Sequence, residues 1–203
     1  MKQNIKIYLS GSIKKSGQYG EIDYWNDEDK AAIRQNLDPL PVLFLDPNIR
    51  TQNLSDPFAT FGRDLFQVYA ADFVFVDARN KRGLGVGAEM AFAKSRSIPV
   101  VTLAPPNSHY VRNDVVILDQ TLPNWMHPFV SSLSDFVAPS IEAACRWIKE
   151  DLLTGKACIR GPECYEEGIV HYLNTQLENE SEMHDLVSSD QEIQAKLEPL
   201  FAK

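Results

Sequence analysis

The chain of 203 residues has few cysteines and histidines and no long apolar run. Its three cysteines, Cys145, Cys158 and Cys164, show no C-x-x-C spacing, so the sequence predicts neither a disulfide framework nor a zinc site. No stretch approaches about 18 consecutive apolar residues, and Lys2 and Lys6 interrupt the first segment, which predicts neither a signal peptide nor a membrane span. We therefore expect a cytoplasmic protein that holds no metal or other cofactor and does not bind membranes.

The chain also lacks an excess of positive charge. It has 20 Lys and Arg against 28 Asp and Glu, a net charge of −8, which argues against nucleic acid or anionic lipid as a partner. Residues 1–160 hold 18 acidic and 18 basic residues, whereas residues 161–203 hold ten acidic residues and two lysines. We interpret the last segment as a solvated acidic extension or, alternatively, as a surface for a basic partner.

Short apolar runs alternate with helix-like segments along most of the chain. The runs that indicate buried strands lie at residues 5–9, 42–45, 73–76, 98–103 and 136–138. Helices are expected at about 27–37, 57–71, 85–96 and 140–153. This alternation predicts an α/β fold: a doubly wound, Rossmann-like or flavodoxin-like parallel sheet covered by helices on both faces.

We place this α/β domain at residues 1–154 and a helical C-terminal extension at 155–203. The extension has two helical stretches, at about 164–178 and 189–201. In doubly wound sheets, ligands bind outside the carboxyl ends of the strands. The turns that follow the predicted strands are therefore the places to look for a site.

The turn after the first predicted strand is Ser10-Gly11-Ser12-Ile13. Such a turn offers backbone N–H groups and side-chain hydroxyls to an anion or a sugar. The same residues equally suit a tight structural turn in which Gly11 supplies backbone freedom.

The turn after the third predicted strand leads into a glycine-rich helix start. Gly83, Gly85 and Gly87 alternate, and Glu89 follows in the first turns of the helix. The glycines allow a ligand to approach the backbone, and the helix dipole favours an ionised Glu89, as a nucleophile requires. Alternatively, Glu89 only complements the helix terminus. The spacing differs from the G-x-G-x-x-G fingerprint that follows a first strand, so NAD is not expected.

Asp64, on the helix before the third strand, lies three residues after Phe61 and four before Val68. It is therefore expected beside the buried stripe of that helix, near the same edge of the sheet as Glu89. Two carboxylates would then face one ligand. The alternative is that Asp64 is a structural anchor between helix and loop.

Three ordered motifs resemble the nucleoside 2-deoxyribosyltransferase superfamily. They are I-Y-L-S-G-S-I from Ile7, R-D-L-F-Q-V-Y-A-A-D-F-V-F-V-D from Arg63, and G-L-G-V-G-A-E-M-A-F-A from Gly83. The third motif is especially similar to the 2′-deoxynucleoside 5′-monophosphate N-glycosidases. The resemblance spans about residues 4–110. It implies an enzyme that cleaves the N-glycosidic bond of a nucleoside or nucleotide, works as a homodimer or larger homo-oligomer, and needs no cofactor.

The resemblance also implies roles for single residues. Glu89 matches the nucleophile, and Asp64 matches the aspartate that orients the sugar and assists proton transfer to the leaving base. Ser12 matches a serine that binds a 5′-phosphate. Ser108, next to Asn107, resembles a phosphate-binding serine contributed across a dimer interface.

Other candidates depart from the family pattern. Gly83 stands where the hydrolases have a phosphate-contacting serine and the transferases have an aspartate. Asp77, at the end of the third predicted strand, is either a substitute for that acid or a turn cap. The basic run 79–82 is either a phosphate contact or a solvated loop. Aromatic side chains that could stack on the base are Tyr8, Tyr24 and Trp25, with core packing as the alternative for Tyr8.

In such an enzyme a glutamate would capture the sugar as a covalent glycosyl-enzyme. Hydrolysis and transfer to a second base share this intermediate, so both reactions stay open. Two other functions also stay open. One is a non-catalytic nucleotide-binding or sensing domain. The other is a phosphoribohydrolase of the lysine-decarboxylase-like group, whose P-G-G-x-G-T-x-x-E motif is not matched here.

Overall fold

A parallel sheet of five strands forms the centre of the computed structural model, which describes residues 4–13, 25–49, 55–155 and 157–201. The strands run in the order β2-β1-β3-β4-β7, and all neighbours are parallel. Their bounds are β1 Ile5–Ser10, β2 Val42–Leu45, β3 Phe73–Asp77, β4 Val100–Leu103 and β7 Phe136–Ala138. The strands predicted from apolar runs are confirmed.

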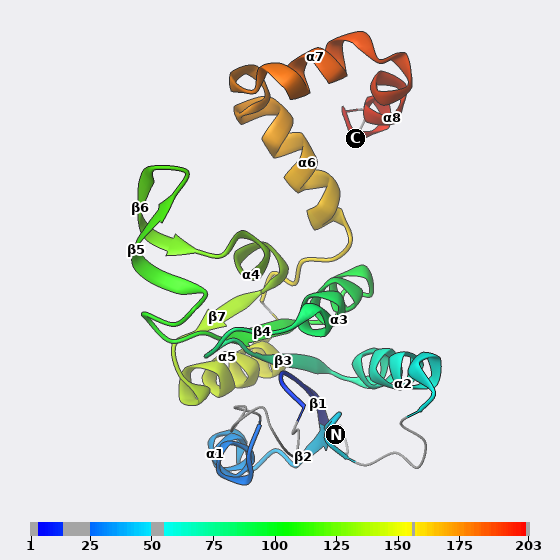
Figure 1. The fold of residues 1–203 in the computed structure, drawn as a ribbon. Coiled ribbons are helices and arrows are strands. Elements are labelled where there is room, and N and C mark those ends of the chain that lie inside the picture. The colour runs from blue at the N-terminus through cyan, green and yellow to red at the C-terminus, as the bar shows by residue number, and fades with distance from the viewer. Residues whose placement is uncertain (1–3, 14–24, 50–54, 156, 202–203) are drawn as a thin grey trace. The chain divides into compact units, whose positions relative to one another are not determined.

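Helices cover both faces of this sheet (Figure 1). On one face, α1 (Asp27–Leu37) and α5 (Ile141–Thr154) pack on Ile7, Leu9 and Phe75. The other face carries α2 (Pro57–Ala70), α3 (Leu84–Ser95) and α4 (Pro128–Leu133). Because side chains alternate along a strand, Tyr8 lies on this second face, between Ile7 and Leu9 on the first. The predicted doubly wound fold is confirmed.

Side-chain caps start the first two helices. The N–H of Asp29 donates to Asn26 Oδ1 (2.8 Å), and the N–H of Asn26 donates to Asp29 Oδ2 (3.4 Å), which makes a capping box for α1. Asp56 Oδ1 accepts from the N–H of Ala59 (2.9 Å) ahead of Pro57 and so caps the start of α2. Helix α3 differs because its N-cap, Gly83, has no side chain to offer.

An antiparallel hairpin was not predicted. It consists of β5 (Val111–Ile117) and β6 (Gln120–Met126). Its two turn residues, Leu118 and Asp119, have φ of 48° and 62°. Hairpin turns of this kind favour Asn-Gly or Asp-Gly, and Leu-Asp lacks that signature.

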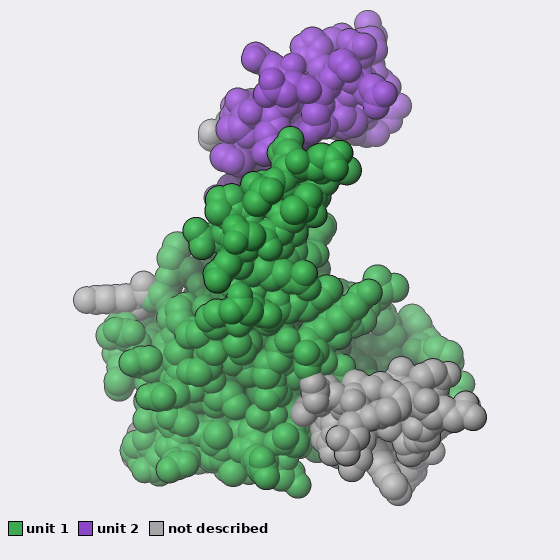
Figure 2. Space-filling view, turned by 60° about the vertical axis from the view of Figure 1, so that its left-hand side comes forward, with its two compact units in different colours: residues 1–161 green, residues 162–203 purple. Residues whose placement is uncertain are grey.

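The chain divides into two compact units, residues 1–161 and residues 162–203 (Figure 2). The first unit extends past the predicted boundary at residue 154 because Arg160 is bonded back to it. The N–H of Arg160 donates to Asp135 Oδ1 (2.9 Å), and its carbonyl accepts from the ammonium of Lys94 (3.1 Å). Lys94 and Asp135 are fully buried and paired with each other.

The second unit is helical. Its elements are α6 (Glu163–Thr175), a 3₁₀ turn (Leu177–Asn179), α7 (Ser181–Ser189) and α8 (Gln191–Phe201). Helix α7 was not predicted. The unit carries all ten acidic residues of the C-terminal segment, and none of residues 162–201 is buried. In the part of the chain that the structure describes, no helix has the length and apolar character needed to cross a membrane.

Candidate functional site

The strand order places the candidate site at the carboxyl ends of β1 and β3. From β1 the chain passes to β2 on one side and then to β3 on the other, so the direction of winding reverses between β1 and β3. Ligands of doubly wound sheets bind at such a reversal. Ser10 ends β1, and Asp77 ends β3 beside it.

Glu89 is held at this point by two hydroxyl groups of β1. Tyr8 and Ser10 are two residues apart and therefore face the same side of the strand, toward α3. Tyr8 Oη donates to Glu89 Oε1 (2.8 Å), and Ser10 Oγ donates to Glu89 Oε2 (2.5 Å). Tyr8 and Ser10 are fully buried. Each oxygen of the Glu89 carboxylate thus accepts one hydrogen bond from a hydroxyl of β1.

The protonation of Glu89 differs from what its helix position led us to expect. Burial raises the pKa of Glu89, and the negative charge of Asp64 raises it further, whereas the hydrogen bonds from Ser10 and Tyr8 lower it. The resulting pKa is about 7. Glu89 is therefore partly protonated at neutral pH, because the loss of hydration outweighs any effect of the helix start. Burial and the neighbouring Glu89 also raise the pKa of Tyr8 above its usual range.

Asp64 lies close enough to Glu89 for its charge to raise the pKa of that group and of Tyr8. The structure therefore brings together the two carboxylates that the sequence placed at one edge. Asp64 is also paired with an arginine, because Arg63 Nε (3.1 Å) and Nη2 (2.9 Å) both donate to its Oδ1. Arg63 also donates to the carbonyls of Pro47 (2.8 Å) and Ile49 (3.1 Å).

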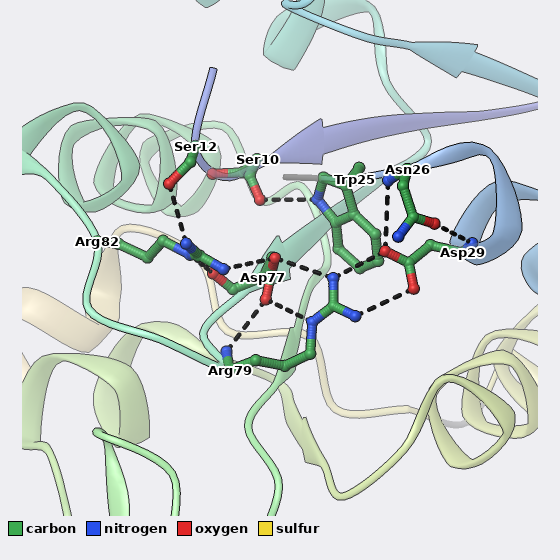
Figure 3. A network of polar contacts seen from close by, with 8 residues as sticks. All are labelled: Ser10, Ser12, Trp25, Asn26, Asp29, Asp77, Arg79 and Arg82. Carbon is green, nitrogen blue, oxygen red and sulfur yellow. Dashed lines mark hydrogen bonds and ion pairs between the residues drawn. The ribbon is translucent and has the colours of Figure 1, made fainter. Parts of the chain in front are cut away.

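Asp77 has no exposed surface and is enclosed by two arginines (Figure 3). Its Oδ1 accepts from Arg79 Nε (3.0 Å), and its Oδ2 accepts from Arg79 Nη2 (3.0 Å) and contacts Arg82 Nη2 (2.5 Å). Burial opposes ionisation, but hydrogen bonds from Arg79 and Arg82 outweigh it and lower the pKa of Asp77. This geometry favours the role of Asp77 as a turn cap over that of a substitute acid. The ionised carboxylate has no proton to donate.

The two arginines are bonded to the protein and are not solvated: Arg79 is partly buried and Arg82 almost fully buried. Arg79 Nη1 and Nη2 donate to the two oxygens of Asp29 (3.0 and 2.8 Å), which links the end of β3 to the start of α1. The Arg82 side chain is 3% exposed, and its Nε donates to the carbonyl of Asp77 (2.5 Å). Lys81 between them is exposed.

Trp25 belongs to the core, so its indole is not available to stack on a base as we had expected. It is 1% exposed, packs against Phe75 at a ring-centroid distance of 4.8 Å, and donates from Nε1 to the carbonyl of Ser10 (3.0 Å). A Cβ at Gly11 would lie 3.4 Å from both Trp25 and Asp77, so the turn passes close over both side chains. Tyr24 lies outside the described residues.

Ser12 is oriented by Arg82. The Nη1 of Arg82 donates to Ser12 Oγ (2.9 Å), and a guanidinium cannot accept, so the hydroxyl hydrogen of Ser12 is left to donate elsewhere. The N–H of Arg82 donates to Tyr110 Oη (2.8 Å), which connects the segment before the hairpin to the start of α3. Ile13, the last described residue of this turn, is 42% exposed.

The three glycines at the start of α3 face open space. A Cβ at Gly83, Gly85 or Gly87 would meet no heavy atom within 4 Å, and none of them has a positive φ. Neither packing within the described residues nor backbone strain therefore requires glycine at these positions. Leu84 between them is 96% exposed.

Ser108 and Asn107 lie in the turn after β4. Asn107 has a φ of 63°, and the N–H of Ser108 donates to the carbonyl of Pro105 (3.1 Å). The Oγ of Ser108 is buried without a hydrogen-bond partner among the described residues. Within that part of the chain, no hydrogen bond joins Ser108 to Glu89.

The described residues contain no group of three or more His, Cys, Asp or Glu side chains that could hold a metal ion. No protein-family model matches the sequence, and no curated protein matches it. Among solved structures, the chain is similar to one described as a conserved protein from Enterococcus faecalis V583. The match has a TM-score of 0.53 and 21% identity, and it covers 72% of this chain and 98% of that chain. This likeness supports the fold and carries no information about activity.

Proposed function

We propose that this protein cleaves the N-glycosidic bond of a nucleoside or a nucleoside 5′-monophosphate, with Glu89 as the nucleophile. One observation carries the proposal: a largely buried carboxylate, held by two hydroxyls, lies beside a second carboxylate where the winding of the sheet reverses. The three motifs that resemble the nucleoside 2-deoxyribosyltransferase superfamily support it.

The chemistry begins with the ionised form of Glu89. A carboxylate oxygen attacks C1′ of the sugar, a C–O ester bond forms, and the C1′–N bond breaks with its electron pair leaving on the base. Water or a second base then attacks C1′, and the ester bond breaks with its electron pair returning to Glu89. Tyr8 and Ser10 hold the two carboxylate oxygens in place throughout.

Binding of the substrate would use the surfaces that the protein leaves open. The glycines at 83, 85 and 87 allow a sugar or phosphate to approach the start of α3. Ser12, with its hydrogen available, is the proposed donor to a 5′-phosphate. Ser108, whose Oγ is buried and has no partner among the described residues, would be a second donor to the site of a neighbouring subunit, as the resemblance implies. If so, Ser12→Ala raises KM for 5′-monophosphates and leaves KM for nucleosides unchanged.

A homodimer is also part of the proposal. Helix α2 exposes four aromatic side chains, with Phe58 82%, Phe61 54%, Phe66 67% and Tyr69 62% exposed. A cluster of this kind on one helix is more typical of an interface than of a monomer surface. It supports the oligomer that the resemblance implies.

The experiment is a substrate panel. The protein is incubated with ribo- and deoxyribonucleosides, with and without a 5′-phosphate and with and without a free acceptor base, and released bases are resolved by chromatography. We expect base release from at least one deoxynucleoside substrate, a loss of 1,000-fold or more in Glu89→Gln, on the order expected for removal of a nucleophile, and no change in the exposed control Glu150→Gln.

Each result of the panel has a definite meaning. Base exchange without net release would indicate a transferase. Undiminished release by Glu89→Gln would contradict the nucleophile. If the wild-type protein released no base at all, the proposed activity would be wrong, and ligand binding without turnover would remain.

A further inference from the structure

Four basic side chains gather at the base of the β5–β6 hairpin, close to the start of α3, and form what we call the basic cluster. Lys81 comes from the loop before α3, His109 and Arg112 from the chain that enters the hairpin, and His127 from the chain that leaves it. The Nη2 of Arg112 lies 3.5 Å from His109 Nδ1. Loss of hydration lowers the pKa of His109, and the charges of the other three bases lower it further. Positive charge is therefore concentrated here, although residues 1–160 as a whole are balanced.

No acid in the described ranges of the chain offsets the charge of the basic cluster. Its four members form no ion pair with any described Asp or Glu. Asp114 follows Arg112 on the same face of β5, but within the described structure the two are not paired. Arg79 shows the contrast, because Asp29 and Asp77 both pair with it. Cations that converge without a counter-charge repel one another, so the basic cluster favours the binding of an anion.

Tyr110 joins the members of the basic cluster and adds a hydroxyl donor. Its ring centroid lies 4.8 Å from that of His109 and 5.4 Å from that of His127, with both imidazole rings nearly perpendicular to it. Tyr110 Oη accepts from the N–H of Arg82 (2.8 Å), which leaves the hydroxyl hydrogen to donate. Ammonium and guanidinium groups are donors only, and Lys81 is exposed. This set of donors suits a phosphoryl group, which carries up to two negative charges and offers several acceptor oxygens.

The basic cluster and Ser12 lie at opposite ends of one arginine. The main-chain N–H of Arg82 donates to Tyr110 Oη, whereas its Nη1, at the tip of the side chain, donates to Ser12 Oγ (2.9 Å). Gly83 follows Arg82 directly, and a Cβ at Gly83 would meet no heavy atom within 4 Å. A phosphoryl group at the basic cluster is therefore distinct from one held by Ser12. The length of one arginine side chain is also short enough for a chain of phosphates to connect the two places.

We propose that the basic cluster binds a phosphoryl group, at a site separate from the 5′-phosphate position proposed for Ser12. Its ligating groups are the side chains of Lys81, His109 and Arg112 and the hydroxyl of Tyr110. The phosphoryl group is either the outermost phosphate of a nucleoside 5′-di- or triphosphate whose first phosphate lies at Ser12, or a free phosphate ion. The site involves no bond cleavage, so it holds whether or not this protein releases a base. A nucleic acid is disfavoured, because the chain has a net charge of −8 and this positive charge is confined to one place.

The test follows the imidazole ring protons of His109 by NMR in the full chain. The chain has four histidines, so each can be assigned by single substitutions, with His109→Gln identifying this one. Inorganic phosphate is titrated at constant ionic strength, with sodium chloride as the balancing salt. It should shift the His109 resonances to saturation and raise the pKa of His109, because a bound anion opposes the neighbouring cations. His171 and His184, in the second unit, should not move. The absence of a saturable shift at His109 would overturn the proposal.

Variants locate the anion. Lys81→Gln combined with Arg112→Gln should weaken phosphate binding at His109 about tenfold or more, because two of the attracting charges are lost. The double variant should melt no lower than the wild type without phosphate, since repulsion within the basic cluster is relieved. Ser12→Ala should leave the phosphate affinity at His109 unchanged, as should the matched control Arg146→Gln, an exposed arginine on α5. Undiminished binding by the double variant, or an equal loss in Ser12→Ala, would overturn the separate site.

Nucleotides distinguish the two sources of the phosphoryl group. Nucleoside 5′-mono-, di- and triphosphates of one base are titrated into Glu89→Gln, which prevents turnover, while His109 is observed. If the site takes the outermost phosphate of a nucleotide, a di- or triphosphate binds about tenfold more tightly than the monophosphate, and the Lys81→Gln and Arg112→Gln pair removes this preference. Equal affinity for all three nucleotides, with phosphate still shifting His109 in their presence, identifies the free ion. A failure to release base in the substrate panel would refute the proposed activity and leave these results unaffected.

Discussion

Replacing Glu89 with glutamine should stabilise the fold above pH 7 while it abolishes base release. The reason is the environment of the carboxylate, which is largely removed from water and faces two hydroxyls and a second carboxylate. An ionised group in such surroundings destabilises the folded state, whereas a neutral amide of the same shape does not. Active sites commonly trade stability for function in this way.

The magnitude follows from the pKa. Folding moves the pKa of Glu89 from an ordinary 4.5 to about 7, so the folded state binds this proton more tightly than the unfolded state does. The stabilisation is fully present below pH 4.5 and is lost as the pH rises through 7. At about 1.4 kcal/mol per pH unit the limit is roughly 3 kcal/mol, and partial hydration of the site reduces the expected effect to about 1 to 3 kcal/mol.

The assay is urea unfolding of the wild type, Glu89→Gln and the exposed control Glu150→Gln at pH 5 and pH 8. We expect Glu89→Gln to exceed the wild type by about 1 to 3 kcal/mol at pH 8, to approach it at pH 5, and to show an unchanged m-value. Glu150→Gln should match the wild type at both pH values. An identical difference at pH 5 and pH 8, or a variant less stable than the wild type at pH 8, would refute the reasoning.

Three further changes test other parts of the site. Gly85→Ala and Gly87→Ala should each stabilise the protein by about 0.5 to 1 kcal/mol in thermal melts, since no described atom opposes the new Cβ, yet lower kcat/KM at least tenfold; unchanged kcat/KM would show that no ligand approaches there. Asp77→Asn should lower the free energy of unfolding by about 3 kcal/mol, because two guanidinium groups lose a buried partner; a loss below about 1 kcal/mol would contradict this. Phe58→Ser combined with Phe66→Ser should convert a dimer to a monomer in light scattering, and a wild-type monomer would refute the dimer.

Much of the fold could be predicted because its strands are apolar runs that end in turn residues. Phe73 to Val76 and, apart from Lys6, Ile5 to Leu9 are buried on both faces of the sheet, and such runs are visible in a sequence without any partner. The hairpin of β5 and β6 could not be found in this way. Its strands are largely exposed, and its turn at Leu118 and Asp119 lacks the residues that usually mark one.

The candidate site, too, could be predicted only in part. Asp64 and Glu89 could be placed together from topology alone, because the helices that carry them flank the same end of the sheet. Contacts between distant side chains could not be predicted, and Arg79 with Asp29, fifty residues apart, is the clearest case. Trp25 was misjudged for the same reason, because its indole N–H is satisfied by a carbonyl that only the folded turn brings within reach.

The pairing of buried carboxylates explains why Glu89 is suited to become an ester. In the described part of residues 1–161, four acids with buried side chains each pair with a lysine or an arginine: Asp29, Asp46, Asp77 and Asp135. Forming an ester on any of them would take away the charge that pairs with the cation, at about 3 to 5 kcal/mol where that cation is fully buried, as Lys94 is. Glu89 is bonded to the hydroxyls of Tyr8 and Ser10, which remain satisfied by an ester oxygen as well as by a carboxylate. Covalent capture of a sugar would therefore neutralise an unfavourable charge at Glu89, whereas it would leave an unpaired cation at each of the other four.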